Sequence, residues 1–203
     1  MKAVLIRTGT ANLASVRAGL IRAGVDVELT LDSKTVREAP LTVLPGVGAF
    51  GASVLPLREH GLDAALKERI AAEKPTLAVC VGLQLLCSSS EESPGADGLG
   101  VLPVHVTRFG DQAPTVPQLG WNRIETDPGC EMLEQGYAYF ANSYKMPSVP
   151  EGWRAAWAEH GDRFVAAVER GPVLACQFHP ELSGALGKAV LGRWVARARE
   201  VQS

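Results

Sequence analysis

The chain has 203 residues, of which 46% are hydrophobic and 21% are charged, as in an ordinary globular protein with a single sizeable core. Its formal net charge of -2 gives no reason to expect nucleic acid or an anionic membrane surface as a partner. No apolar run approaches the roughly 20 residues that a membrane-spanning helix needs. The opening segment 1–7 is too short and too soon interrupted for a signal peptide. We therefore expect one cytoplasmic domain.

The first half of the chain alternates short apolar runs with stretches of helical periodicity. Strands are expected at 3–7, 25–31, 42–44 and 76–80. Helices are expected at 12–23 and 51–73, the second one broken near His60 and Gly61. This alternation predicts an α/β fold, with a mostly parallel central sheet covered by helices on both faces.

The second half is rich in strands. A loop is expected at 88–100, where Ser, Glu, Pro and Gly dominate. Strand candidates follow at 101–109, 120–125, 137–140, 153–159, 164–169 and 173–178. Gly161 and Asp162 predict a tight hairpin turn, and 183–201 predicts a closing amphipathic helix. Additional antiparallel strands are therefore expected beside the parallel sheet.

The segment 76–86 carries the first candidate catalytic residue. A short apolar run ends at Cys80, Gly82 follows, and a helical pattern begins at once. This pattern is typical of a nucleophile held on a sharp turn from strand to helix. A helix N-terminus beneath a thiol favours the thiolate, which is the reactive form. The alternative is a buried structural cysteine at the end of a core strand.

A second candidate group follows the last expected strand. His179, Pro180 and Glu181 come directly after it, and residues two apart in an extended chain point to the same side. Nucleophile, base and orienting acid are thus available in Cys80, His179 and Glu181. Taken alone, His179 would more often be a core or loop histidine. The Gly46 loop, Cys80 and His179 all follow strands, and in open α/β sheets ligands bind at the carboxyl ends of strands.

The cysteines do not indicate a metal site. Cys80, Cys87, Cys130 and Cys176 include no C-x-x-C pair, and the loose C-x-x-H spacing of Cys176 and His179 lacks a second ligand pair. We expect neither a metal nor a cofactor, and we expect reduced thiols, as thiolate catalysis requires.

Five segments give the chain a family resemblance that runs almost from end to end. They read LPGVGAF at 44–50, CVGLQ at 80–84, PQLGWN at 117–122, YFANSY at 139–144 and QFHPELSG at 177–184. With them the chain resembles the triad-type (class I) glutamine amidotransferases, and more narrowly the glutaminase subunits of imidazole glycerol phosphate synthases. The resemblance implies one flavodoxin-like amidotransferase domain over residues 1–203. It also implies hydrolysis of L-glutamine, with ammonia passing through a tunnel to a (β/α)8-barrel cyclase partner in histidine biosynthesis.

The resemblance also suggests roles around the triad. The tetrahedral oxyanion would be held by N–H groups of Val81 and of the loop at Val47 and Gly48, which could reorient when the partner binds. Substrate contacts are expected at Gly46, Gln84, Ser143 and Tyr144. Partner contacts are expected at Asn12, Trp121 and Asn122. For the glycine loop the alternative is a plain tight turn, and for Trp121 a core position.

Four positions depart from the usual family pattern. Arg7 and Ala11 replace an acid and a glycine in the loop after the first strand, Ala78 replaces the leading glycine of the elbow, and Leu182 replaces a frequent lysine. The changes at Arg7, Ala11 and Leu182 concern docking to the partner.

Three other functions stay open. They are a glutaminase serving another synthase such as the pyridoxal phosphate one, a non-catalytic regulatory subunit, and a free-standing cysteine hydrolase. The pyridoxal phosphate synthase family shows P-G-G-E-S where this chain has P-G-V-G at 45–48, which disfavours the first of them.

Overall fold

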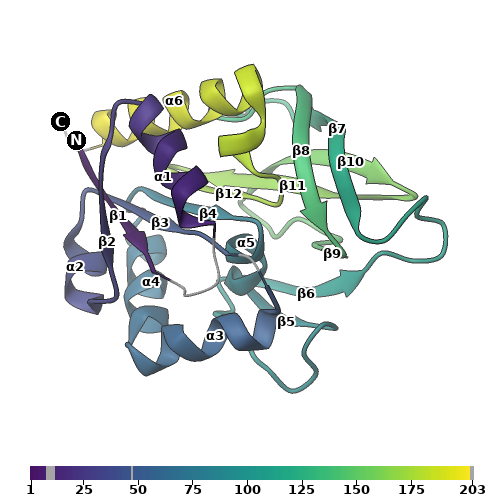
Figure 1. Ribbon diagram of the computed structural model, residues 1–203, viewed down its shortest axis with the longest axis horizontal. Helices are drawn as coiled ribbons and strands as arrows, with labels where there is room; N and C mark the ends of the chain where they lie inside the picture. Colours follow the sequence, from purple (N-terminus) through teal and green to yellow (C-terminus); the bar gives the residue numbers. More distant parts are fainter. Residues whose placement is uncertain (8–11, 47, 202–203) are drawn as a thin grey trace.

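A computed structural model describes residues 1–7, 12–46 and 48–201 (Figure 1). Its centre is a nine-stranded sheet. One half is parallel and consists of β1 (Lys2–Ile6), β2 (Asp26–Thr30), β3 (Leu41–Leu44), β4 (Thr76–Val79) and β12 (Val173–Cys176). The other half is antiparallel and consists of β7 (Gln118–Thr126), β8 (Gly136–Asn142), β10 (Arg154–His160) and β11 (Asp162–Arg170). The strand order is β2-β1-β3-β4-β12-β11-β10-β7-β8.

The innermost parallel strands lie in the core. Every residue of β3, β4 and β12 is buried. Strands that are covered on both faces need nearly continuous apolar runs, and these three supply them with sequences such as Leu-Thr-Val-Leu and Val-Leu-Ala-Cys.

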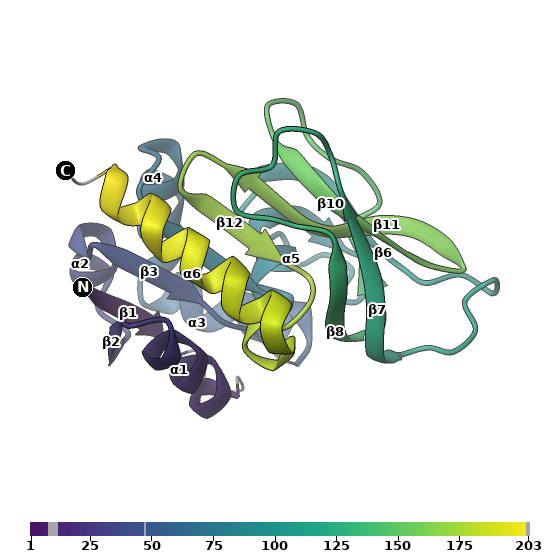
Figure 2. The same ribbon diagram turned by 90° about the horizontal axis from the view of Figure 1, so that it is seen from above.

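Helices cover both faces of the parallel half. Figures 1 and 2 show α1 (Leu13–Arg22) and α6 (Gly184–Glu200) on one face. The other face is covered by α3 (Phe50–Glu59), α4 (Leu62–Ala71) and the short α5 (Val81–Leu86), with α2 (Ser33–Glu38) packed against α4. A single 3-10 turn, η1 (Pro180–Leu182), precedes α6. These layers confirm the predicted α/β class with added antiparallel strands.

Several local predictions are confirmed. The break in the second long helical stretch falls at Gly61, whose φ of 62° is left-handed and separates α3 from α4. Gly161, at φ 78°, forms the predicted hairpin turn between β10 and β11.

The prediction of a loop at 88–100 is wrong for its first residues. There β5 (Cys87–Ser90) pairs with β6 (Leu102–Arg108), and β9 (Tyr144–Lys145) completes a small second sheet. Backbone pairing with β6 outweighs the weak strand preference of three successive serines. The predicted last strand, 173–178, is also too long, because β12 ends at Cys176 and frees the chain for the turn that bears His179.

No helix among residues 1–7, 12–46 and 48–201 is long and apolar enough to cross a membrane. Within the same residues, no group of three His, Cys, Asp or Glu side chains could hold a metal ion.

Candidate active site

Two neighbouring strands bring the candidate nucleophile and base to the same edge of the sheet. β12 runs parallel to β4 with Cys176 opposite Val79. The N–H of Cys80 continues this pairing by donating to the carbonyl of Cys176 at 2.7 Å. Cys80 and His179 therefore leave adjacent strands in the same direction, although 99 positions separate them in the sequence.

Cys80 occupies the strained turn that the sequence predicts. Its φ of 55° and ψ of -113° are unfavourable for a residue with a side chain. The surrounding backbone packs closely against this turn. A Cβ on Gly82 would lie 2.3 Å from the Leu44 carbonyl oxygen, and one on Gly46 would lie 2.5 Å from the Gly82 nitrogen. The two glycines thus let the loop after β3 pack directly beneath the nucleophile.

His179 and Glu181 form a buried pair. Nδ1 of His179 lies 2.9 Å from Oε1 of Glu181, and the side chains are only 9% and 2% exposed. Burial lowers the pKa of His179, but hydrogen bonds with Cys80 and Glu181 and the negative charges of both raise it to about 10. Glu181 and Cys80 thus favour the charged form of the imidazole.

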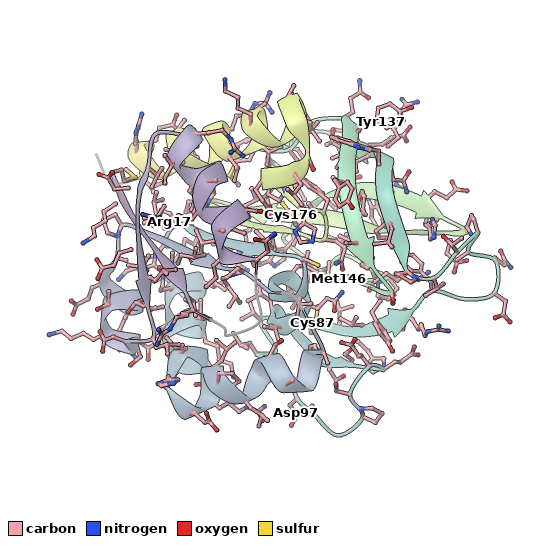
Figure 3. The ribbon with its side chains drawn as sticks, in the orientation of Figure 1. Arg17, Cys87, Asp97, Tyr137, Met146 and Cys176 are labelled. Atoms are coloured by element: carbon pink, nitrogen blue, oxygen red, sulfur yellow. The ribbon has the colours of Figure 1, made fainter. Side chains whose placement is uncertain are left out.

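The other thiols are poor nucleophile candidates. Burial raises the pKa of Cys87 to about 12, and burial together with nearby carboxylates raises that of Cys130 to about 11. Burial also raises the pKa of Cys176 well above its ordinary value. Cys87 and Cys176 lie in the interior (Figure 3), with Sγ of Cys87 3.7 Å from Sδ of Met146. The remaining cysteine, Cys80, lies beside the His179 imidazole.

The turn that carries His179 is fastened to the edge of β8. The His179 N–H donates to the Tyr139 carbonyl at 2.9 Å. The buried Ser183 hydroxyl donates to the His179 carbonyl at 2.6 Å and accepts from the Tyr139 N–H at 2.9 Å. On the other side, Arg22 of α1 donates to the Glu181 carbonyl at 3.2 Å. These bonds fix the positions of His179 and Glu181 in the turn.

Cys80 and His179 open into a common cleft of about 510 Å³. Predicted site residues that line it are Gly48, Val81, Gln84, Ser143 and Tyr144. Glu92, Ala141 and Asn142 also line it and were not predicted from the sequence. The Glu92 carboxylate accepts from the Phe50 N–H at 2.7 Å, which holds it at the cleft wall.

Two amide side chains turn their nitrogen atoms to the same backbone oxygen. The carbonyl of Tyr144 accepts from Nε2 of Gln84 at 3.1 Å and from Nδ2 of Asn142 at 3.0 Å. The second N–H of Gln84 is directed to Oε1 of Gln177 at 2.9 Å. Gln84 therefore has only its oxygen left for a ligand, and Oδ1 of Asn142 has no partner among the described residues.

The candidate oxyanion donors are only partly in place. The Val81 N–H donates to the Gly46 carbonyl at 3.3 Å, so this N–H is not free to bind an oxyanion in this conformation. Gly46 is buried, whereas Gly48 is exposed with a φ of 97°. Val47 and Ala11 lie outside the described residues.

The predicted partner residues fall in different environments. Asn12 caps α1, its side-chain oxygen accepting from the Ser15 N–H at 3.3 Å. Trp121 is 58% exposed on β7, whereas the neighbouring Asn122 donates to the Glu159 carbonyl of β10 at 2.8 Å. Trp121 is therefore not a core residue.

The sequence profile of class I glutamine amidotransferases matches residues 4–196. The chain belongs to this family. It is 41% identical over 202 residues to the imidazole glycerol phosphate synthase subunit HisH of Mycolicibacterium paratuberculosis, covering 96% of this chain and 97% of that one. It is 38% identical to HisH of Escherichia coli O157:H7, covering 94% and 97%. The predicted resemblance is thereby confirmed.

Solved structures agree on the fold. A crystal structure described as glutamine amidotransferase superposes with a TM-score of 0.77 at 20% identity, covering 97% of this chain and 98% of that one. The structure of PurLQS from Thermotoga maritima gives 0.74 at 14% identity, covering 100% and 99%.

Proposed function

We propose that this chain is the glutaminase subunit of an imidazole glycerol phosphate synthase and acts through Cys80, His179 and Glu181. The observation that carries this proposal is the shared cleft of Cys80 and His179, with Glu181 buried behind the imidazole. Residues 1–203 act as one glutamine amidotransferase domain, in the cytoplasm and without a cofactor.

The chemistry follows from the position of the Cys80 sulfur beside the His179 imidazole. His179 takes the thiol proton, and the Cys80 sulfur attacks the side-chain carboxamide carbon of glutamine, so that the oxyanion forms. The His179 imidazolium then gives its proton to the departing nitrogen, which leaves as ammonia and gives a thioester on Cys80. His179 next takes a proton from water, the hydroxide equivalent attacks the thioester, and glutamate leaves. Glu181 holds the imidazole in one orientation and stabilises its cation in both halves.

The cleft offers complementary groups for the amino-acid end of glutamine. Its ammonium meets the Glu92 carboxylate and the free Gln84 oxygen, because the donors of Gln84 are used elsewhere. Its carboxylate meets backbone N–H groups at Ser143 and Tyr144. This arrangement assigns Gln84 the role of an acceptor.

A backbone movement completes the oxyanion site. The Val81 N–H becomes available only when the Gly46 carbonyl releases it, and the glycines on either side of Val47 allow that movement at low conformational cost. We connect this movement with partner binding, which would keep glutamine hydrolysis low until the ammonia acceptor is present. Equal glutaminase rates with and without the liganded partner would remove this switch.

The partner is a (β/α)8-barrel cyclase in a one-to-one heterodimer, docked around the outer face of β7 and β8. Exposed apolar side chains gather there: Leu119 (68%), Trp121 (58%) and Tyr137 (63%), with Leu182 (41%) on the adjoining η1. Figure 3 shows Tyr137 at the outer end of β8. Leu182 extends this apolar surface where relatives often carry lysine, so apolar contact replaces an ion pair there. Arg7 is exposed at the end of β1 and is a further candidate contact.

Ammonia reaches the cyclase through an enclosed passage. In neutral water ammonia is mostly protonated and no longer nucleophilic, so a dry route preserves its reactivity.

The test uses the purified chain with and without the cyclase. Cys80→Ala is expected to abolish glutamine hydrolysis while the complex still makes product from added ammonium salt. A Cys80→Ala protein with ordinary glutaminase turnover would refute the assignment. Wild-type protein without turnover in the complex would favour the regulatory subunit, and full turnover without any partner would favour a free-standing hydrolase.

A further inference from the structure

Gln177 is a buried amide next to the nucleophile that the mechanism above does not use. It follows β12 directly and is 0% exposed. Its Nε2 lies 3.7 Å from Sγ of Cys80, within the range of a hydrogen bond to sulfur. Its Oε1 accepts from Nε2 of Gln84 at 2.9 Å. Both ends of this amide therefore have partners, one of them the reacting atom.

A chain of hydrogen bonds determines which end of Gln177 faces the sulfur. The Tyr144 carbonyl can only accept, so Gln84 must turn its NH2 group toward it. The second N–H of that group then needs an acceptor, and Oε1 of Gln177 is the acceptor present. The NH2 group of Gln177 is consequently directed at Cys80. The alternative orientation would place two NH2 groups against each other in a buried site, which is unfavourable.

We propose that Gln177 is a catalytic residue that donates a hydrogen bond to Cys80 Sγ and stabilises the thiolate. This proposal rests on the proposed function, since it gives Cys80 the role of nucleophile. Charged acceptors gain more from a hydrogen bond than neutral ones, so a fixed donor favours the thiolate over the thiol. The thiolate is then stabilised by two groups, the positive charge of His179 and the amide dipole of Gln177.

The same chain connects the nucleophile with the wall of the substrate cleft. Gln84 and Tyr144 line the cleft, and Gln177 lies between Gln84 and the sulfur. The donor of Gln177 is therefore set before glutamine binds. Its loss is expected to lower the rate of the chemical step more than the affinity for glutamine.

The test compares Gln177→Met, which keeps the length of the side chain, with Gln177→Leu, which is shorter; both replace the amide with an apolar group and remove the donor. The rate of Cys80 alkylation by iodoacetamide is measured against pH, with the labelled peptide identified by mass spectrometry. Both variants are expected to react roughly tenfold to a hundredfold more slowly at neutral pH and to regain the wild-type rate at higher pH. In the complex, kcat is expected to fall by a similar factor with little change in KM.

Gln118→Met serves as the matched control. Gln118 is a buried glutamine of β7, only 4% exposed, and its amide oxygen has no partner among the described residues. If both Gln177 variants keep the wild-type alkylation profile and kcat, the proposal is overturned, whether or not their melting temperatures fall. Gln177→Met removes no volume and is expected to fold. Circular dichroism checks the folding of both variants, and the kinetic result is taken from a variant that folds.

The outcomes also separate this proposal from the function on which it rests. Normal turnover in Gln177→Met, with none in Cys80→Ala, rejects the role of Gln177 alone. Normal turnover in Cys80→Ala rejects both.

Discussion

Replacing Glu181 with glutamine isolates the electrostatic contribution of the carboxylate to the proposed triad. The amide has the shape of the carboxylate but no charge, and it cannot stabilise an imidazolium to the same degree. The rise in the His179 pKa from 6.5 to about 10 corresponds to roughly 5 kcal/mol in favour of the charged imidazole, net of the opposing effect of burial. Cys80 and Glu181 both raise this pKa, so removing the Glu181 charge is expected to cost a part of that stabilisation.

Glu181→Gln is thus expected to lower the His179 pKa and to reduce kcat by about a hundredfold. The direction follows from the raised pKa, because the wild-type imidazolium persists above pH 6.5 and is lost only as the pH passes about 10. In the variant this loss moves to lower pH. Titration of isotope-labelled histidine by NMR measures the shift directly, and His105→Gln helps to assign the signals. A His179 pKa that is unchanged in Glu181→Gln would refute this reasoning.

Three further predictions concern the cleft, the turn and the docking face. Glu92→Gln is expected to raise KM for glutamine roughly tenfold to a hundredfold with little change in kcat, and steady-state kinetics showing an unchanged KM would contradict a role in binding the ammonium. Ser183→Ala removes the hydroxyl between His179 and β8, and it is expected to lower the free energy of unfolding by about 1–3 kcal/mol in urea titrations and to reduce kcat. Trp121→Ala is expected to weaken cyclase binding by about 2 kcal/mol or more in calorimetry. Leu55→Ala, at a side chain that is 59% exposed on α3, is the matched control. Equal losses of cyclase affinity in Trp121→Ala and Leu55→Ala would contradict an interface at Trp121.

Much of the fold could be predicted because its central strands are apolar runs bounded by glycines and helical periods. The helix break at Gly61 and the hairpin turn at Gly161 both fall at glycines with positive φ, a backbone conformation that glycine adopts readily. Shorter elements could not be predicted. α2 has six residues and a single buried side chain, Val36, so its helical pattern is too short to stand out. β5 depends on pairing with β6, which local sequence does not encode.

The proposed triad residues could be picked out for a different reason. Cys80 directly follows β4, and His179 and Glu181 lie in the short turn after β12, each in a recognisable local pattern. The pairing of β4 with β12 brings the two segments together. Glu92 gave no such signal, because it lies in a polar segment where a carboxylate is ordinary. Gln177 did give a sequence signal, because it is a polar residue in an otherwise apolar run, and a buried polar side chain needs a hydrogen-bond partner. The occupied Val81 N–H depends on the position of Gly46, which only the structure gives.

The most direct test of the account is the reaction of the complex with a diazoketone analogue of glutamine, followed by mass spectrometry of the labelled peptides. We predict one equivalent of adduct on Cys80, loss of glutaminase activity in proportion to labelling, and protection by glutamine. Complete inactivation with the adduct on any other residue, or full labelling of Cys80 with activity retained, would contradict the assignment of Cys80 as the nucleophile.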